Sequence, residues 1–131
     1  MKDLSAAGKR ILIVEDEPLI RDVCMRVLTG EGLRVDTAVD GMVAKGMLEK
    51  KDYDLCLVDI RTPVMNGKEL YQYMLNKNPK MADRVIFTTG DLVNSYTQRF
   101  LEIAGRPYLA KPFTPDELRA IVKEALEKLD T

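Results

Sequence analysis

Three short apolar segments of the chain each end in charged residues, and these charges are the first candidates for chemistry. They are Glu15 and Asp16 after residues 11–14, Asp59 after residues 55–58, and Lys111 after residues 107–110. A carboxylate at the end of a buried strand is costly unless its charge is used there. If the three segments are parallel strands of one sheet, their charges meet at one edge and form a site.

The three acids favour a hard divalent cation. Close carboxylates repel one another, and burial alone would force one of them to take up a proton. A divalent cation removes that conflict, and an all-oxygen ligand set with room for water suits Mg²⁺ or Mn²⁺. The plainer alternative is that the acids lie on solvated loops. Because two acids follow one predicted strand and a third acid follows another strand, a metal site is the better interpretation.

A lysine and a hydroxyl are predicted at the same edge of the sheet, and together with a metal ion they indicate a site for phosphoryl transfer. Lys111 can pair with Asp59 or with an anion placed on it, and Thr88 and Thr89 end a neighbouring segment. A metal ion, an ammonium and a hydroxyl neutralise a transferred phosphoryl group from several sides. The Asp59 carboxylate can then be the nucleophile, giving an aspartyl phosphate. The alternative of an ordinary surface lysine is disfavoured, because Lys111 lies between an apolar strand and a proline.

The composition excludes several other kinds of site. The chain has no histidine, which removes histidine general bases, histidine metal sites and a phosphohistidine role. Its net charge of −1 gives no basic footprint for nucleic acid or for a membrane surface. No apolar run approaches the ~20 residues that span a bilayer, and no signal peptide is seen, so we expect a cytoplasmic protein. Cys24 and Cys56 lie in apolar patterns and are expected to be buried and reduced.

Five apolar segments alternate with five helical patterns. The predicted strands are residues 10–14, 33–37, 54–59, 84–89 and 107–110, and the predicted helices are residues 18–29, 40–50, 67–77, 91–103 and 114–129. This alternation specifies a parallel sheet covered on both faces, a doubly wound (βα)5 domain of the α/β class. The 131 residues suffice for one such domain, over residues 10–129. Residues 1–9 are predicted to be a flexible lead-in.

Four segments, in their order and spacing, closely resemble the receiver domain of two-component response regulators. They read Ile-Leu-Ile-Val-Glu-Asp-Glu-Pro (11–18), Leu-Val-Asp-Ile-Arg-Thr-Pro-Val-Met-Asn-Gly (57–67), Ile-Phe-Thr-Thr-Gly (86–90) and Tyr-Leu-Ala-Lys-Pro-Phe (108–113). Each is weakly specific alone, but the combination is highly specific and covers about residues 9–129. The resemblance implies a flavodoxin-like fold with a five-stranded parallel sheet in the order 2-1-3-4-5.

The resemblance also implies roles for the acids. Asp59 would accept a phosphoryl group from a histidine kinase or a histidine phosphotransfer domain. The chain would catalyse only its own phosphorylation and dephosphorylation, as a regulatory domain and not as an enzyme with an output activity. Asp16, Asp59 and the backbone carbonyl of Arg61 would bind Mg²⁺, with Glu15 acting through a water molecule.

Further roles follow from the same resemblance. Thr89, which precedes the small residue Gly90, and Lys111 would hold the phosphoryl oxygens. Tyr108 matches the aromatic residue that turns inward as Thr89 shifts. The Lys111–Pro112 peptide bond is predicted to be cis.

Two surfaces are expected to meet partner proteins. The surface of residues 91–103, 107–110 and 114–129 would bind a downstream protein target rather than DNA or a membrane. The first helix would meet the phosphodonor, with Ile20 as the chosen contact. The alternative for Ile20 is burial in the core under the helix.

Several features leave alternatives open. Residues 104–108 are about one residue shorter than the common family pattern and contain a proline, and the loops resemble those of receivers attached to hybrid sensor kinases. A small aspartyl-phosphate phosphatase would need an aspartate at position 61, where this chain has Arg61. A flavin-binding module would need a Ser/Thr/Gly-rich loop after residue 14. A degenerate receiver that acts as a constitutive interaction module is the remaining alternative.

Overall fold

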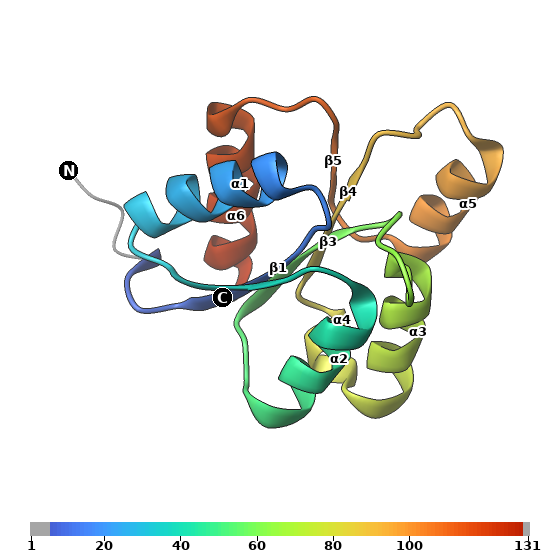
Figure 1. The fold of residues 1–131 in the computed structure, drawn as a ribbon, viewed down its shortest axis with the longest axis horizontal. Coiled ribbons are helices and arrows are strands. Elements are labelled where there is room, and N and C mark those ends of the chain that lie inside the picture. The colour runs from blue at the N-terminus through green and yellow to red at the C-terminus, as the bar shows by residue number, and fades with distance from the viewer. Residues whose placement is uncertain (1–5, 130–131) are drawn as a thin grey trace.

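The computed structural model describes residues 6–129 and has a five-stranded parallel sheet in the order β2-β1-β3-β4-β5 (Figure 1). The strands are β1 (Arg10–Val14), β2 (Arg34–Ala38), β3 (Leu55–Asp59), β4 (Val85–Thr89) and β5 (Tyr108–Ala110). The helices are α1 (Pro18–Gly30), α2 (Gly41–Lys50), α3 (Gly67–Lys77), α4 (Pro79–Ala82), α5 (Ser95–Ala104) and α6 (Pro115–Leu129). The predicted fold class and strand order are therefore confirmed.

The sheet separates two hydrophobic cores. Helices α1 and α6 cover one face, and α2, α3, α4 and α5 cover the other (Figure 1). Successive strand residues point to opposite faces, so Leu12 and Val58 join the core under α3, whereas Ile13 and Leu57 join the core under α1 and α6. Because both faces are covered, β1 and β3 are apolar along almost their whole length.

The helices α5 and α4 differ most from the predicted helices, whereas the bounds of the others agree within one residue. Helix α5 begins at Ser95 rather than at residue 91, because the Asn94 side chain accepts hydrogen bonds from the N–H groups of Tyr96 and Thr97 at 2.8 and 3.2 Å. This is a strong N-cap, and it leaves residues 91–94 outside the helix. The four-residue helix α4 was not predicted, since it is too short to give a helical period.

The last strand is shorter than predicted because of Pro107. Proline has no N–H to donate. The hydrogen bonds between β4 and β5 therefore begin at the Pro107 carbonyl, which accepts a hydrogen bond from the Phe87 N–H at 3.0 Å. The strand β5 itself starts at Tyr108 and lies at the edge of the sheet, where a proline is tolerated.

The predicted flexible lead-in falls only partly on described residues. Residues 1–5 lie outside them. Ala6 is buried against the core under α1 and α6, and the Gly8 N–H donates a hydrogen bond to the Gly32 carbonyl at 3.2 Å. The packed part of the chain therefore begins before residue 10.

Candidate functional site

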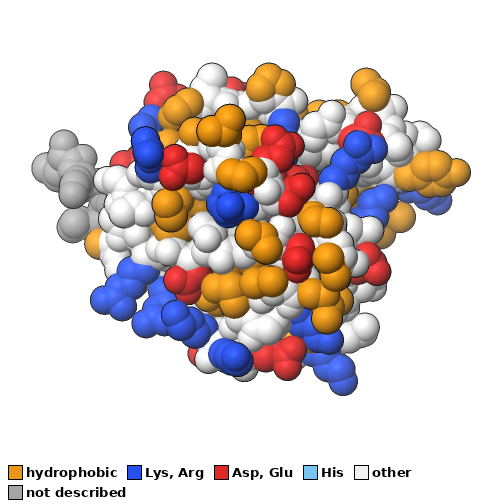
Figure 2. Space-filling model, in the orientation of Figure 1, with side chains coloured by type: hydrophobic (Ala, Val, Ile, Leu, Met, Phe, Trp, Pro, Cys, Tyr) orange, Lys and Arg blue, Asp and Glu red, His pale blue; other side chains and the backbone are white. Residues whose placement is uncertain are grey.

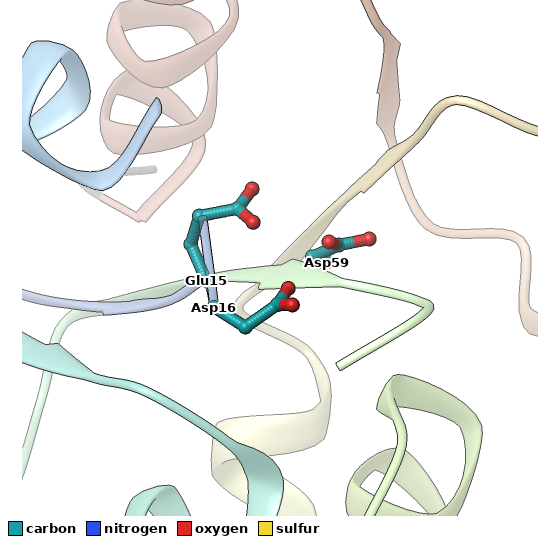
Figure 3. A group of neighbouring side chains, drawn as sticks. All are labelled: Glu15, Asp16 and Asp59. Carbon is teal, nitrogen blue, oxygen red and sulfur yellow. The ribbon is translucent and has the colours of Figure 1, made fainter. Parts of the chain in front are cut away.

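The three predicted acids lie around one space at the carboxyl edge of the sheet. Glu15 and Asp16 follow the end of β1, and Asp59 is the last residue of β3 (Figure 3). One carboxylate oxygen from each lies within 4.8 Å of the others. Glu15 and Asp59 are buried, with 3% and 5% of their surface exposed, whereas Asp16 is exposed. The cluster is thus open to solvent on the side of Asp16.

Lys111 bridges the two buried acids. Its Nζ lies 2.7 Å from Glu15 Oε1 and 3.0 Å from Asp59 Oδ2. Burial alone would lower the pKa of Lys111, but the hydrogen bonds to Glu15 and Asp59 outweigh it and raise that pKa above its ordinary value. Burial also raises the pKa of Glu15, against the opposing hydrogen bond from Lys111. Lysine 111 therefore carries its charge at neutral pH and compensates the acids.

Backbone groups hold both buried carboxylates in place. The Arg61 N–H donates to Asp59 Oδ1 at 3.0 Å, and the Glu17 N–H donates to Glu15 Oε2 at 3.1 Å. The Arg21 guanidinium donates to the Glu15 carbonyl at 2.9 Å and so fixes the turn between β1 and α1. These bonds leave the carboxylates little freedom to rotate.

A glycine allows α3 to begin directly against the end of β3. A Cβ atom at Gly67 would lie 2.7 Å from the Ile60 Cα and 2.9 Å from the Asp59 carbonyl oxygen. The α3 N-terminus is closed by a capping box between Asn66 and Glu69. No larger residue fits at position 67 without moving the backbone that carries Asp59.

Thr89 and Lys111 are neighbours across the last strand pair. The Lys111 N–H donates to the Thr89 carbonyl at 2.8 Å, and the Thr89 hydroxyl accepts a hydrogen bond from the Asp91 N–H at 3.1 Å. Thr89 is 1% exposed. Thr88, the other candidate hydroxyl, is the residue in register with Asp59. The Lys111–Pro112 bond is cis, as predicted.

The remaining predicted residues lie around this centre rather than in it. Tyr108 is about half exposed on β5, with 47% of its surface accessible. Ile20 is half-buried, and together with Pro112 and Phe113 it lines an apolar hollow of about 230 Å³ beside Lys111. Both cysteines are free and buried, as expected, and burial raises the pKa of Cys24 to about 11.

Three residues that shape the site were not singled out from the sequence. The sequence marks Gly67 as the end of a family motif and the start of a helix, and nothing in it indicates the contact of Arg21 with the carbonyl of Glu15. Asp91 was assigned to the helix of residues 91–103, although the capping residue Asn94 is a signal that the helix begins later. Its carboxylate lies 2.7 Å from the Arg61 guanidinium.

A family model described as the response regulator receiver domain matches residues 11–123. This chain belongs to that family. Receiver domains are the phosphoacceptor switches of two-component systems; they are regulatory domains that interact with histidine kinases and with downstream effectors. The flavin-binding and phosphatase alternatives are not favoured.

The curated relatives of this receiver domain are longer proteins. The transcription factor SKN7 of Saccharomyces cerevisiae is 33% identical over 118 residues, which are 88% of this chain and 18% of SKN7. The transcriptional regulatory protein TcrA of Mycobacterium tuberculosis is 35% identical over 116 residues, 87% of this chain and 44% of TcrA. The chain thus spans less than half the length of either relative.

Solved structures give the same fold over nearly the whole receiver domain. A CheY-like receiver domain protein from Methanospirillum hungatei has a TM-score of 0.85 at 32% identity, over 95% of this chain and 98% of that chain. The receiver domain of the sensor histidine kinase PA1611 from Pseudomonas aeruginosa has a TM-score of 0.81 at 32% identity, over 92% and 99% of the two chains. That structure has a magnesium ion coordinated in its active site cleft.

Proposed function

We propose that Asp59 is the phosphoacceptor of this receiver domain. The observation that carries the proposal is the position of its buried carboxylate, between the acids Glu15 and Asp16 on one side and the Lys111 ammonium on the other. Its Oδ1 and Oδ2 are engaged by the Arg61 N–H and by Lys111, which orients the carboxylate as a nucleophile.

The reaction is a displacement at phosphorus. A carboxylate oxygen of Asp59 forms a bond to the phosphorus atom of the donor, and the bond from phosphorus to the donor's imidazole nitrogen breaks with its electron pair on nitrogen. The chain contains no histidine, so the phosphohistidine belongs to another domain. Hydrolysis later transfers the phosphoryl group to water and restores the carboxylate. Lys111 and the Thr89 hydroxyl stabilise the phosphoryl oxygens during these steps.

The acid cluster fits a divalent cation, Mg²⁺ or Mn²⁺. Three carboxylates and one ammonium leave two formal negative charges at the site, and the oxygen donors suit a hard ion. Asp16, Asp59 and the Arg61 carbonyl would hold the ion, with Glu15 acting through a water molecule. When bound, the ion supplies positive charge to the transferred phosphoryl group.

Two surfaces of the domain connect this chemistry to partner proteins. Ile20 and the apolar hollow beside Lys111 are the docking point for the phosphodonor, because they border the acceptor site. Thr89 and Tyr108 couple phosphorylation to a conformational change at the surface of α5, β5 and α6, where a downstream protein binds. The exposure of Tyr108 supports this role, since an inward turn of its ring would change the surface.

Labelling with a small phosphodonor tests the proposed function. Acetyl phosphate with Mg²⁺ should add one phosphoryl group to the intact wild-type chain, seen by mass spectrometry, and none to Asp59→Asn. A chelator should abolish the adduct. An adduct of equal yield in Asp59→Asn would overturn the assignment of Asp59, and full labelling in excess chelator would overturn the metal requirement.

A further inference from the structure

An ion pair joins the loop that follows Asp59 to the loop that follows Thr89. Arg61, in the loop after β3, and Asp91, in the loop after β4, meet through a guanidinium nitrogen and Asp91 Oδ2 at 2.7 Å. The Asp91 side chain is 19% exposed and that of Arg61 is 67% exposed. Together with residues such as Thr62 and Asn94, the pair lines a hollow of about 610 Å³ between the two loops.

Each member of the pair also holds one of the reacting groups through its backbone. The Arg61 N–H donates to Asp59 Oδ1 at 3.0 Å, and the Asp91 N–H donates to the Thr89 hydroxyl at 3.1 Å. A continuous chain of contacts therefore runs from the Asp59 carboxylate through Arg61 and Asp91 to the Thr89 hydroxyl. This series of contacts links the loop after β3 to the loop after β4, in addition to the pairing of the two strands and the hydrogen bond from the Ile60 N–H to the Thr88 carbonyl at 3.0 Å.

We propose that Arg61 and Asp91 are positioning residues, a brace that fixes the Thr89 hydroxyl relative to the Asp59 carboxylate for phosphoryl transfer. The inference rests on the proposed role of Asp59. Orientation is decisive in such a step, because a small misplacement of a charge-stabilising group is costly in rate. Neither side chain needs to touch the phosphoryl group, since each acts through the backbone N–H beside it.

The brace and a simple effect of charge predict opposite results for loss of the Asp91 charge. If Arg61 acts only by attracting the anionic donor, its removal slows labelling and removal of the Asp91 charge speeds it. If the pair is a brace, loss of either partner slows labelling. Loss of both then costs no more than loss of one, because the contact is already broken in each single variant.

The experiment compares Arg61→Gln, Asp91→Asn and the double variant, with acetyl phosphate as donor and Mg²⁺ at saturation. We expect each single variant to lower the maximal labelling rate by roughly three- to tenfold, and the double variant to match the slower single variant. Arg61→Lys, which keeps a cation opposite Asp91, should recover at least half of the wild-type rate. Circular dichroism and urea unfolding verify that the variants are folded, which matters most for Asp91, whose side chain is partly buried.

An ion pair far from the site provides the matched control. Arg26 and Asp22 pair at 3.1 Å on the exposed surface of α1, and Arg26→Gln should leave the labelling rate unchanged. Opposite shifts in the two single variants, wild-type rates in both, or losses that add in the double variant would each overturn the brace. The proposed function is tested separately, by labelling of the wild type and its loss in Asp59→Asn. The brace is judged only on the ratios of labelling rates between the variants and the wild type.

Discussion

At the scale of residues, the site consists of acidic side chains and one lysine that the parallel strands bring close together. Glu15 and Asp59 are buried acids, and each is paired with Lys111 and with a backbone N–H. Breaking a buried pair by removing one partner is costly, because it leaves a charge uncompensated. The lysine therefore has a structural role as well as the proposed role in phosphoryl transfer.

Substitution of Lys111 by alanine separates these two roles. Without a divalent cation, we expect Lys111→Ala to lower the free energy of unfolding by about 2 kcal/mol, since Glu15 and Asp59 then face each other. Mg²⁺ should restore part of that loss, whereas the labelling rate should stay about 100-fold below wild type. Urea unfolding and mass spectrometry measure the two effects. Lys128→Ala, on the exposed surface of α6, is the control, and wild-type labelling in Lys111→Ala would refute the role of the ammonium.

At the scale of elements, the positions of the site residues depend on how closely helices approach strand ends. Helix α3 begins at Gly67, directly beside the backbone of Ile60. The edge strand β2 is tied to the chain before β3 by a hydrogen bond from the Tyr53 hydroxyl to Asp36 at 2.6 Å, with Lys51 on the same carboxylate at 3.3 Å. Each contact can be tested with one substitution and one matched control.

Two glycines in helices should respond in opposite ways to alanine. Gly67→Ala places a Cβ atom 2.7 Å from the Ile60 Cα, so we expect a loss of stability of about 2 kcal/mol or more and slower labelling. Gly46→Ala, inside α2, meets no atom within 4 Å and should stabilise the protein by about 1 kcal/mol. Thermal unfolding measures both. Equal effects of the two substitutions would show that the approach of α3 to β3 is not tight.

The pair of Tyr53 and Asp36 makes a prediction that depends on pH. The hydrogen bond from Tyr53, with a smaller effect of Lys51, lowers the pKa of Asp36 below its ordinary value of 3.8. A lowered folded-state pKa stabilises the protein above the ordinary value, and that stabilisation is lost as the pH falls through the lowered one. We expect Tyr53→Phe to cost about 1 kcal/mol near neutral pH, and less as the pH falls below 3.8.

Urea unfolding at a series of pH values measures that difference. The exposed residue Tyr96 provides the control, since Tyr96→Phe should leave stability unchanged at each pH. A cost of Tyr53→Phe that does not change between pH 7 and pH 3 would contradict the link to Asp36.

At the scale of the whole molecule, the sheet gathers the acceptor site at one edge and leaves varied surfaces around it. Hydrophobic side chains lie in several groups among charged ones on the face shown in Figure 2. None of the helices within residues 6–129 combines the length and the hydrophobicity of a membrane span.

Substitution of Ile20 tests the proposed docking of the phosphodonor. We expect Ile20→Asp to slow transfer from a phosphohistidine domain by roughly tenfold, because a charge is placed in the apolar hollow that meets the donor. Labelling by acetyl phosphate, which needs no docking, should remain at the wild-type rate. Leu75→Asp, on the exposed part of α3, is the control. Equal slowing with both donors would indicate a disturbed fold rather than a lost contact.

Much of this arrangement could be predicted from the sequence, because its signals are strong and local. The apolar runs before Asp59 and Glu15 define parallel strands, and parallel strands bring their carboxyl ends to one edge. The start of α5 was misplaced because four loop residues continue a helical pattern until Asn94 caps the helix. The pairing of Arg61 with Asp91 joins two loops through side chains alone, and no period or spacing in the sequence reports such a contact.

Direct mapping of the phosphoryl group is the measurement that bears most closely on the central claim. The wild-type chain is labelled with acetyl phosphate and Mg²⁺, the acyl phosphate is reduced with borohydride, and the peptides are sequenced by mass spectrometry. We expect reduction of one aspartate, Asp59, at the end of β3. Reduction at Asp16 or Asp91 instead, or a phosphoryl group found on Thr89, would contradict the account.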